Sequence, residues 1–351
     1  MKLAIVGAGN AGCISALHFY MYMPNLEIEI YHDSKHTPIE RVGQGTALPV
    51  TELIFKSLNL DWLDGRIGET VKTGIRYRNW GQKVDSFFHS FDPPYQVAIH
   101  YTPKKLSEYI LTSKVFKVIE KKINNPEKEI DADFIIDCRG RKAIDTKNIN
   151  KIINPINAAL ISSLPRKYMT WTEAVATPNG WTFIVPTEDS LSLGYLYNKE
   201  ITSQQKAIED FKDRFKVENI EYETTFNNYY SASPFVGERT ILNGNQYSFI
   251  EPLEATATGL YEWIARVAYD RFINKASEQY CIDLIEEKVK AISNFVLWHY
   301  KTKSKFNSPF WNYASSLPFD PIKEPEGNEE YGQWQNYSFR NWRENTITSK
   351  V

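Results

Sequence analysis

The chain has 351 residues, 42% of them hydrophobic, so it can bury a sizeable core in one large domain or two closely packed ones. Its 41 basic and 43 acidic residues are evenly mixed and give a net charge of -2, so no electrostatic footprint points to nucleic acid or an anionic membrane. The apolar run from Leu3 is short and meets Gly7, so we expect no signal peptide, and no later run is long enough to span a membrane. The three cysteines have neither metal nor redox spacing. These features predict a cytoplasmic protein without a metal site.

The first predicted unit is a βαβ opening, with strands at Lys2–Val6 and Glu27–Tyr31 around a helix at Ala11–Tyr22. Between the first strand and the helix stands Gly7-Ala8-Gly9-Asn10-Ala11-Gly12, a G-x-G-x-x-G turn that lets backbone approach a pyrophosphate at the helix N-terminus. The candidate cofactor-binding residues are Gly7, Gly9, Ala11 and Gly12. Asp33, one position later than expected, is the candidate ligand of the ribose hydroxyls, and a solvated loop aspartate is the alternative.

The remaining elements follow from periodicity and turn residues. Helices are predicted at Thr102–Leu111, Gln204–Phe215, Leu260–Asn274 and Ala276–Asn294, and strands at Val115–Ile119, Phe134–Asp137, Trp181–Val185 and Ser192–Tyr197. The division that we expect is a single unit over residues 1–314, with a small substrate-binding insertion formed by about 40–130 and 155–235, and an extended C-terminal tail over 315–351. That tail is rich in proline, asparagine and glutamate.

Two late strand ends favour FAD over NAD as the dinucleotide. Phe134–Asp137 runs into the polar turn Cys138-Arg139-Gly140, and Ile241-Leu242-Asn243-Gly244-Asn245 forms a second buried strand with a polar end. Flavin monooxygenase-type folds use such strand ends to close over the flavin and its ribityl chain. Gly244 and Asn245 are therefore candidate cofactor residues, although Asn245 stands where a charged aspartate is usual.

Five segments occur in the order found in a known family. They are Val42–Pro49 (compare G-E-x-T-x-P, with Gln44 for the glutamate), Val71–Trp80, Phe88–Phe91 (compare F-x-H-x-F), Gly180–Pro186 (compare W-x-W-x-I-P) and Phe249–Thr256. In these segments the chain resembles the flavin-dependent tryptophan halogenases, of which it looks like a shortened member. The resemblance spans Met1 to about Trp311.

The resemblance implies an α/β fold: a Rossmann-type FAD-binding domain of the flavin monooxygenase/halogenase kind, with an inserted antiparallel sheet and a mainly helical C-terminal part. It also implies that FADH2, oxygen and a halide (bromide, iodide or chloride) yield hypohalous acid, which halogenates a small indole-like aromatic. A separate flavin reductase supplies FADH2 in this family, and a homodimer is compatible with the sequence.

Residue by residue, the resemblance assigns several roles. Lys72 and Glu254 are the expected catalytic residues, and Gln44, Gly45, Thr46 and Ala47 join the cofactor site. The backbone of Thr256 and Ala257 is expected to bind halide, His89, Phe91 and Trp334 to line the substrate pocket, and Trp181, Phe183 and Pro186 to form the wall toward the flavin.

Plainer interpretations exist for each of these residues. Lys72 is otherwise a solvated strand lysine, and Glu254 a buried acid that accepts helix N-terminal amides. The family has glycine where Ala257 stands, and a positive φ there would cost alanine roughly 1–2 kcal/mol. At the level of function, the alternatives are a flavin monooxygenase that hydroxylates an aromatic, and a non-catalytic FAD-binding protein.

The tail aromatics Trp334, Tyr337, Phe339 and Trp342 are spaced irregularly, which predicts neither an amphipathic helix nor an independent core. They are interpreted either as one wall of a wide, shallow pocket that accepts free indoles better than tryptophan, or as residues that only close the core.

Overall fold

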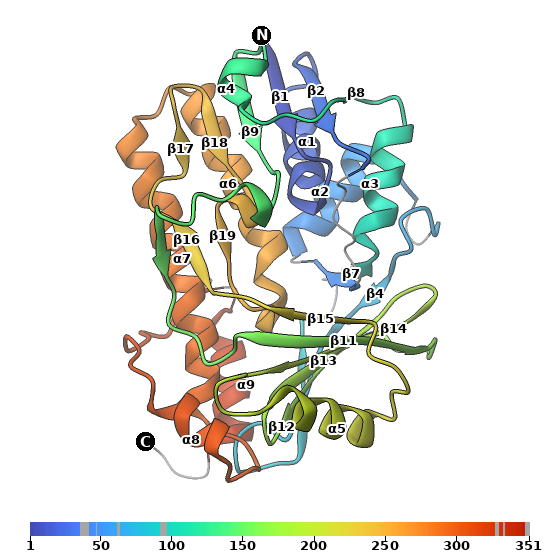
Figure 1. Cartoon of the computed structure of the whole chain (residues 1–351), viewed down its shortest axis with the longest axis vertical. Helices are drawn as coiled ribbons and strands as arrows, with labels where there is room; N and C mark the ends of the chain where they lie inside the picture. The colour runs from blue at the N-terminus through green and yellow to red at the C-terminus, as the bar shows by residue number, and fades with distance from the viewer. Residues whose placement is uncertain are drawn as a thin grey trace.

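The structure, a computed structural model, describes residues 1–35, 42–46, 48–61, 64–91, 97–326, 330–332 and 334–347. Its upper half in Figure 1 is built on a six-stranded sheet of order β17-β18-β9-β1-β2-β8. The strands are β1 Lys2–Val6, β2 Glu27–His32, β8 Lys117–Glu120, β9 Phe134–Asp137, β17 Phe235–Val236 and β18 Thr240–Leu242. All neighbours pair in parallel except β17 and β18, so the carboxyl ends of the central strands meet at one edge.

Helix α1 (Asn10–Tyr22) occupies the centre of this half. Its residues from Asn10 to Phe19 are all buried, because the sheet covers one side while α2 (Leu48–Leu58), α3 (Pro103–Thr112) and α6 (Thr256–Phe272) pack around it. A helix that is enclosed on all sides needs no polar face, which explains the apolar and small residues of α1.

The lower half of Figure 1 contains a seven-stranded sheet of order β15-β11-β14-β13-β12-β5-β6. Its strands are β5 Gly74–Arg78, β6 Ser86–Ser90, β11 Ala158–Pro165, β12 Thr172–Thr177, β13 Gly180–Pro186, β14 Ser190–Tyr197 and β15 Tyr222–Thr225. All pairs are antiparallel except β5 with β12. Helix α5 (Gln204–Phe215) covers one face and buries Ala207 and Phe211 in a satellite core.

Two small sheets lie between the halves, and both carry site residues. One has the order β3-β7-β4, and the other has the order β10-β16-β19. Their strands are β3 Gln44–Gly45, β4 Thr70–Lys72, β7 Ala98–Tyr101, β10 Ile149–Lys151, β16 Tyr229–Ser231 and β19 Ser248–Phe249. The short helices η1 Arg141–Ala143, η2 Gly244–Gln246 and η3 Leu253–Ala255 lie in the same region, whereas α4 Pro126–Glu129 packs against β9 at the top of the upper half (Figure 1).

Helix α7 (Glu278–Lys301) runs along one side of both halves (Figure 1), followed by α8 (Pro309–Ser316). The expectation of an extended tail from residue 315 is wrong for its last part, because α9 spans Asn336–Thr346. Phe339, Trp342 and Thr346 lie on one buried face of α9, at intervals of three and four residues. The earlier aromatics mask this pattern, since Trp334 precedes the helix.

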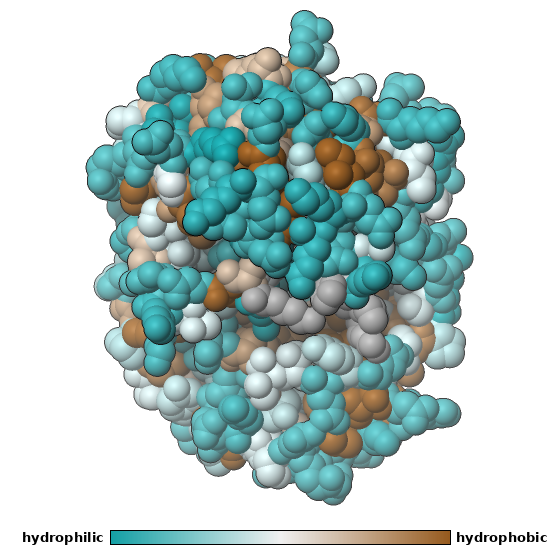
Figure 2. Space-filling view, turned by 45° about the horizontal axis from the view of Figure 1, so that its top comes forward, coloured by the Kyte–Doolittle hydropathy of each residue, from teal (hydrophilic) through white to brown (hydrophobic). Residues whose placement is uncertain are grey.

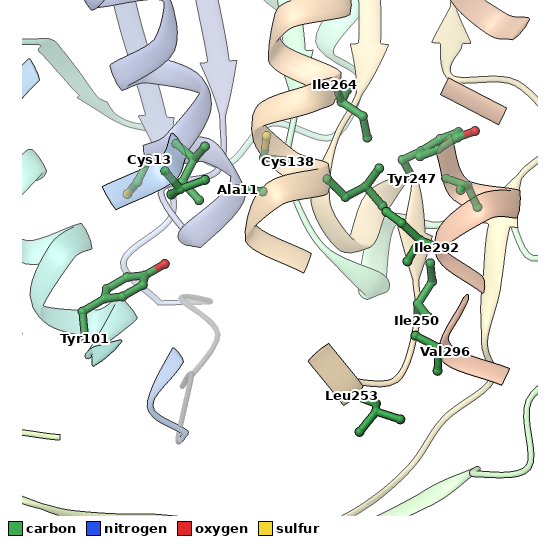
Figure 3. Packing of buried hydrophobic residues seen from close by; sticks show 14 of the residues in the cluster. Ala11, Cys13, Tyr101, Cys138, Tyr247, Ile250, Leu253, Ile264, Ile292 and Val296 are labelled. Atoms are coloured by element: carbon green, nitrogen blue, oxygen red, sulfur yellow. The ribbon is translucent and has the colours of Figure 1, made fainter. Parts of the chain in front are cut away.

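One hydrophobic cluster joins the two halves, because it includes Ile5 of β1 in the upper half and Tyr77 of β5 and Trp181 of β13 in the lower half. Figure 3 shows part of this cluster, with Ala11 of α1, Ile264 of α6 and Ile292 of α7 among the labelled residues. The face in Figure 2 is mainly hydrophilic, with hydrophobic residues in small separate groups. No helix in the described ranges is long and apolar enough to cross a membrane, and no cluster of potential metal ligands occurs within them. The predicted α/β organisation, with an inserted antiparallel sheet and a helical C-terminal part, is confirmed.

Candidate active site

The glycine turn after β1 has the geometry that close phosphate approach requires. Gly7 has a φ of 109°, and Gly9 precedes the first residue of α1. A Cβ atom on Gly12 would lie only 1.9 Å from the Gly7 carbonyl oxygen, so any other residue there would push the turn apart. Asp33 follows β2, the strand next to β1, and its Oδ1 accepts a hydrogen bond from the Lys35 amide at 3.1 Å.

A cavity of about 310 Å³, here called the first cavity, opens beside this turn. Asn10 lines it at the start of α1, and Gln44 and Gly45 of β3 line it from the small sheet. Trp181 and Phe183 of β13 form part of its apolar wall. Gly244 and Asn245 belong to the same region, because η2 approaches α1 so closely that a Cβ on Gly244 would lie 2.5 Å from that of Ala11, and Asn245 lines the cavity.

Lys72 ends β4 and is only 2% exposed. Burial lowers the pKa of its ammonium group to about 8, partly opposed by the nearby Glu254 carboxylate. Its Nζ lies 5.2 Å from the centre of the Phe91 ring. A Cβ on Gly45 would come within 2.8 Å of this Nζ, so the glycine of β3 makes room for the lysine. Lys72 is therefore not a solvated strand residue.

Glu254 is buried in η3 and adopts a left-handed conformation with φ 69°. Its Oε1 accepts a hydrogen bond from the Tyr77 hydroxyl and lies 3.4 Å from Nε2 of His299, and its Oε2 accepts one from Nε1 of Trp334 at 2.9 Å. Burial alone would raise the pKa of this carboxyl, but His299 and Tyr77 hold it below its usual value. Glu254 is therefore an ionised acid with both oxygens engaged.

A second cavity of about 250 Å³ lies on the other side of these two residues. Lys72, Ile75 and Glu254 line both cavities, so they stand where the two meet. His89 and Trp334 line the second cavity, as does Phe91. These three are the residues expected in the substrate pocket.

The rings of His89 and Trp334 stack at 4.9 Å between centroids, and His89 also stacks on Tyr337 at 5.7 Å. Burial lowers the pKa of His89 to about 4, so its ring is neutral near pH 7. Charged side chains line another part of this cavity: Glu262, Arg266, Lys288 and Glu330.

The wall predicted from the W-x-F-x-V-P segment lies along the first cavity, with one change. Trp181 donates a hydrogen bond from Nε1 to Glu251 at 2.9 Å, and Phe183 packs directly over Gly194. Val185 lines the cavity in place of Pro186, whose carbonyl accepts a hydrogen bond from Thr70 at 3.1 Å. Pro186 is the last residue of β13 and is buried outside the cavity lining.

Two further cofactor assignments differ from the expectation. The side chain of Thr46 bonds to Thr51 and to the backbone of Ile99, and it borders the second cavity. Its hydroxyl is thus engaged in holding β3 against β7. Ala47 lies outside the described residues.

In the loop expected to bind halide, the residues with positive φ precede Thr256 and Ala257 in the sequence. Glu254 and Ala255 have φ values of 69° and 53°, whereas Thr256 starts α6 and Ala257 lies in the first helical turn. An alanine at 257 therefore carries no positive-φ strain, and the cost that a positive φ would bring does not arise. The amides of a first helical turn have no intrahelical acceptor and favour anions, so Thr256 and Ala257 still suit a halide.

Several neighbours of the site were not predicted. Tyr77 and His299 hold Glu254, and the wholly buried Glu251 accepts hydrogen bonds from Trp181, Tyr300 and Asn154. Burial raises the pKa of Glu251 to about 7. The segment Glu251-Pro252-Leu253-Glu254 contains two acids, and this pair was the sequence signal that could have indicated a second buried carboxyl beside Glu254.

Comparison with known proteins decides the family. The family model described as tryptophan halogenase matches residues 2–115 and 114–326. The chain belongs to the tryptophan halogenase family. Tryptophan 7-halogenase KtzQ of Kutzneria sp. (strain 744) is 26% identical over 213 residues, which cover 54% of this chain and 39% of KtzQ. Tryptophan 7-halogenase RebH of Lentzea aerocolonigenes is 22% identical over 211 residues, 53% of this chain and 39% of RebH. The matched part is thus about two fifths of these relatives' length.

Solved structures show the same fold over nearly the whole chain. A tryptophan halogenase from Shewanella frigidimarina NCIMB 400 superposes with a TM-score of 0.84 at 18% identity, covering 100% of this chain and 89% of that one. A flavin-dependent halogenase from Xanthomonas campestris gives 0.82 at 15% identity, covering 99% and 89%. The glycine cradle at Gly7–Gly12 and the adjoining first cavity fit FAD, the cofactor that membership of this family implies.

Proposed function

We propose that the chain is a halogenase that uses FADH2, oxygen and a halide to halogenate an electron-rich, indole-like aromatic through hypohalous acid. One observation carries this proposal: Lys72 and Glu254 are buried and line both cavities. A direct hydroxylase would need its substrate beside the flavin. Here the aromatic pocket lies across Lys72, Ile75 and Glu254 from the first cavity.

The bound cofactor would supply, with oxygen and halide, the hypohalous acid. Trp181 and Phe183 line the first cavity but not the second, so they form an apolar wall on the cofactor's side of the boundary and disfavour direct oxygenation. The Lys72 ammonium donates a hydrogen bond to hypohalous acid and orients its halogen toward the ring. As the ring carbon takes the halogen, the oxygen–halogen bond breaks and the hydroxide leaves as water with a proton from Lys72. The ionised Glu254 receives the proton that the ring releases as it regains aromaticity.

The proposal also includes the halide-binding site, the source of FADH2 and the compartment in which the protein works. The first-turn amides of Thr256 and Ala257 hold the halide, with bromide preferred over chloride because heavier halides are more easily oxidised. A separate flavin reductase supplies FADH2, and the protein works in the cytoplasm, with homodimers compatible with its function. Competition between bromide and chloride at equal concentration tests the halide preference, and mainly chlorinated product would contradict it.

The central experiment supplies reductase-generated FADH2, oxygen and bromide with a panel of indoles and phenols, and product masses are read. We expect a bromine isotope pair, lost in Lys72→Ala and Glu254→Gln while FAD affinity stays nearly intact. A product with one added oxygen would indicate hydroxylation, and a protein that binds FAD without product would be a non-catalytic binder. Full activity in Lys72→Ala would contradict the assigned role.

A further inference from the structure

Arg139 and Arg141, two residues apart, differ in whether their guanidinium groups have hydrogen-bond partners. Arg139 is fully engaged: it donates to both Asp137 oxygens at 2.9 and 2.7 Å and to the carbonyls of Ile123 and Asn124. Arg141 has no ion pair or hydrogen bond of its guanidinium in the described ranges, yet it lines the first cavity and is exposed. The Arg141 guanidinium is therefore available to a ligand in the first cavity, whereas that of Arg139 stabilises the fold.

Aromatic rings hold the Arg141 guanidinium in place. It lies 3.7 Å from the ring centre of Phe249 and 5.8 Å from that of Phe226, and these two rings pack edge to face at 5.0 Å. Partial desolvation of the guanidinium lowers the pKa of Arg141, although the group stays charged at any physiological pH. An arginine stacked on a ring keeps its N–H edges free to donate. The neighbouring position Asn245, where an aspartate is usual, brings no negative charge to balance it.

The backbone that leads to Arg141 passes beside the dinucleotide turn. Three residues separate Arg141, the first residue of η1, from the end of β9, the strand paired with β1. The carbonyl of one of them, Cys138, abuts Gly7 so closely that a Cβ on the glycine would lie 2.6 Å away. The side chain of Gln246 in η2 also donates to the Ala143 carbonyl of η1 at 3.0 Å. Arg141 thus begins the short helix η1, which packs on η2, and η2 in turn packs against α1 at the glycine turn.

We propose that Arg141 binds the pyrophosphate of FAD, closing the cradle from the side opposite to the glycine turn. The inference rests on the proposed function only in taking FAD as the cofactor. Guanidinium is the side chain that matches phosphate oxygens with two parallel hydrogen bonds, and such charge-assisted bonds are the strong ones. The glycine turn brings backbone amides and a helix dipole but no full charge, and Arg141 supplies that charge.

The test compares dissociation constants of oxidised FAD and of riboflavin, which lacks phosphate, by flavin fluorescence. For Arg141→Gln we expect FAD to bind about tenfold to a hundredfold more weakly, with riboflavin affinity unchanged. Arg141→Lys should restore part of the loss, and the effect should shrink at high salt. Arg76→Gln is the matched control, since Arg76 also stacks on a ring, at 4.5 Å from Trp171, but lies outside both cavity linings.

Equal losses for FAD and riboflavin would overturn the proposal, since Arg141 would then only shape the flavin-ring site. An effect confined to reduced FAD, visible as a shifted midpoint potential, would place the cation at the ring and overturn it too. Unchanged FAD affinity in a variant with wild-type circular dichroism would do the same. A wild-type chain that binds no FAD would instead refute the proposed function itself.

Discussion

The indole Nε1 of Trp334 donates a hydrogen bond to Oε2 of Glu254 at 2.9 Å. A residue just before the last helix therefore completes the environment of the expected catalytic acid. The turn that presents it is anchored by reciprocal backbone bonds between Tyr331 and Trp334, at 3.0 Å each, and by Lys288, which donates to the Gly332 carbonyl at 3.2 Å. Trp334 thus positions Glu254 as well as lining the second cavity.

Replacing Trp334 by phenylalanine removes this donor and keeps an aromatic ring. A lost hydrogen bond to a charged group costs about 1.5–3 kcal/mol, so we expect kcat to fall roughly tenfold to a hundredfold. The pKa of Glu254 should rise as it loses a donor, which moves the acid limb of the pH–rate profile upward. Trp342→Phe is the control, because Nε1 of Trp342 has no hydrogen-bond partner among the described residues. An effect on KM alone would mean that Trp334 only contacts substrate.

Lys72 carries its charge at a cost in stability. Its pKa is lowered from 10.5 to about 8 in the folded protein, so between these values the unfolded chain binds more protons and stability rises with pH. At pH 7 the buried charge costs on the order of 3 kcal/mol. Lys72→Met should therefore raise the free energy of unfolding in urea by that order and abolish halogenation. The exposed Lys104→Met should change neither, and a destabilised Lys72→Met would show that the pairing with Glu254 outweighs burial.

The protonation of Lys72 also sets a pH dependence for halogen transfer. If the ammonium form orients hypohalous acid, the ratio of halogenated product to FADH2 consumed should fall as pH rises through about 8. Measuring this ratio, rather than the rate, removes the pH dependence of the reductase. A ratio that rises above pH 8 would indicate that the neutral amine captures the halogen instead.

The left-handed Ala255 permits a matched pair of glycine substitutions. In Ala255→Gly, relief of the strain of φ 53° should offset the flexibility gained by the unfolded chain, and we expect stability to change by less than about 1 kcal/mol or to rise. Ala257→Gly, inside the first turn of α6, should lose about 0.5–1 kcal/mol. The free energy of unfolding in urea is measured for both variants. Equal losses of stability would show that Ala255 is unstrained.

Truncation after Ala314 would remove α9 from the core of the protein. Phe339 and Trp342 are fully buried, and Trp342 packs against Tyr77 and Trp80 at ring distances of 4.9 and 5.7 Å. Loss of one such side chain costs about 3–5 kcal/mol. The truncated chain should therefore aggregate or melt far below the wild type. A soluble truncated protein with a normal melting temperature would contradict this.

The sequence alone determined the features that depend on local order along the chain. The glycine turn at Gly7–Gly12 follows from residue types and its place between strand and helix, and the hydrophobic periods located most helices and strands. Motif order also predicted the family. These signals are readable because backbone conformation and strand burial constrain neighbouring residues directly.

Only the tertiary structure decided which side chains meet. Tyr77, His299 and Trp334 lie 177, 45 and 80 residues from Glu254 in the sequence, yet all three contact its carboxylate. Tyr77 reaches it from a strand of the lower sheet and Trp334 from the C-terminal segment. The helix α9 was likewise invisible, since its two large apolar residues become a buried face only against Tyr77 and Trp80. The left-handed positions at Glu254 and Ala255 could not be read either, because packing overrides the intrinsic cost of that conformation for non-glycine residues.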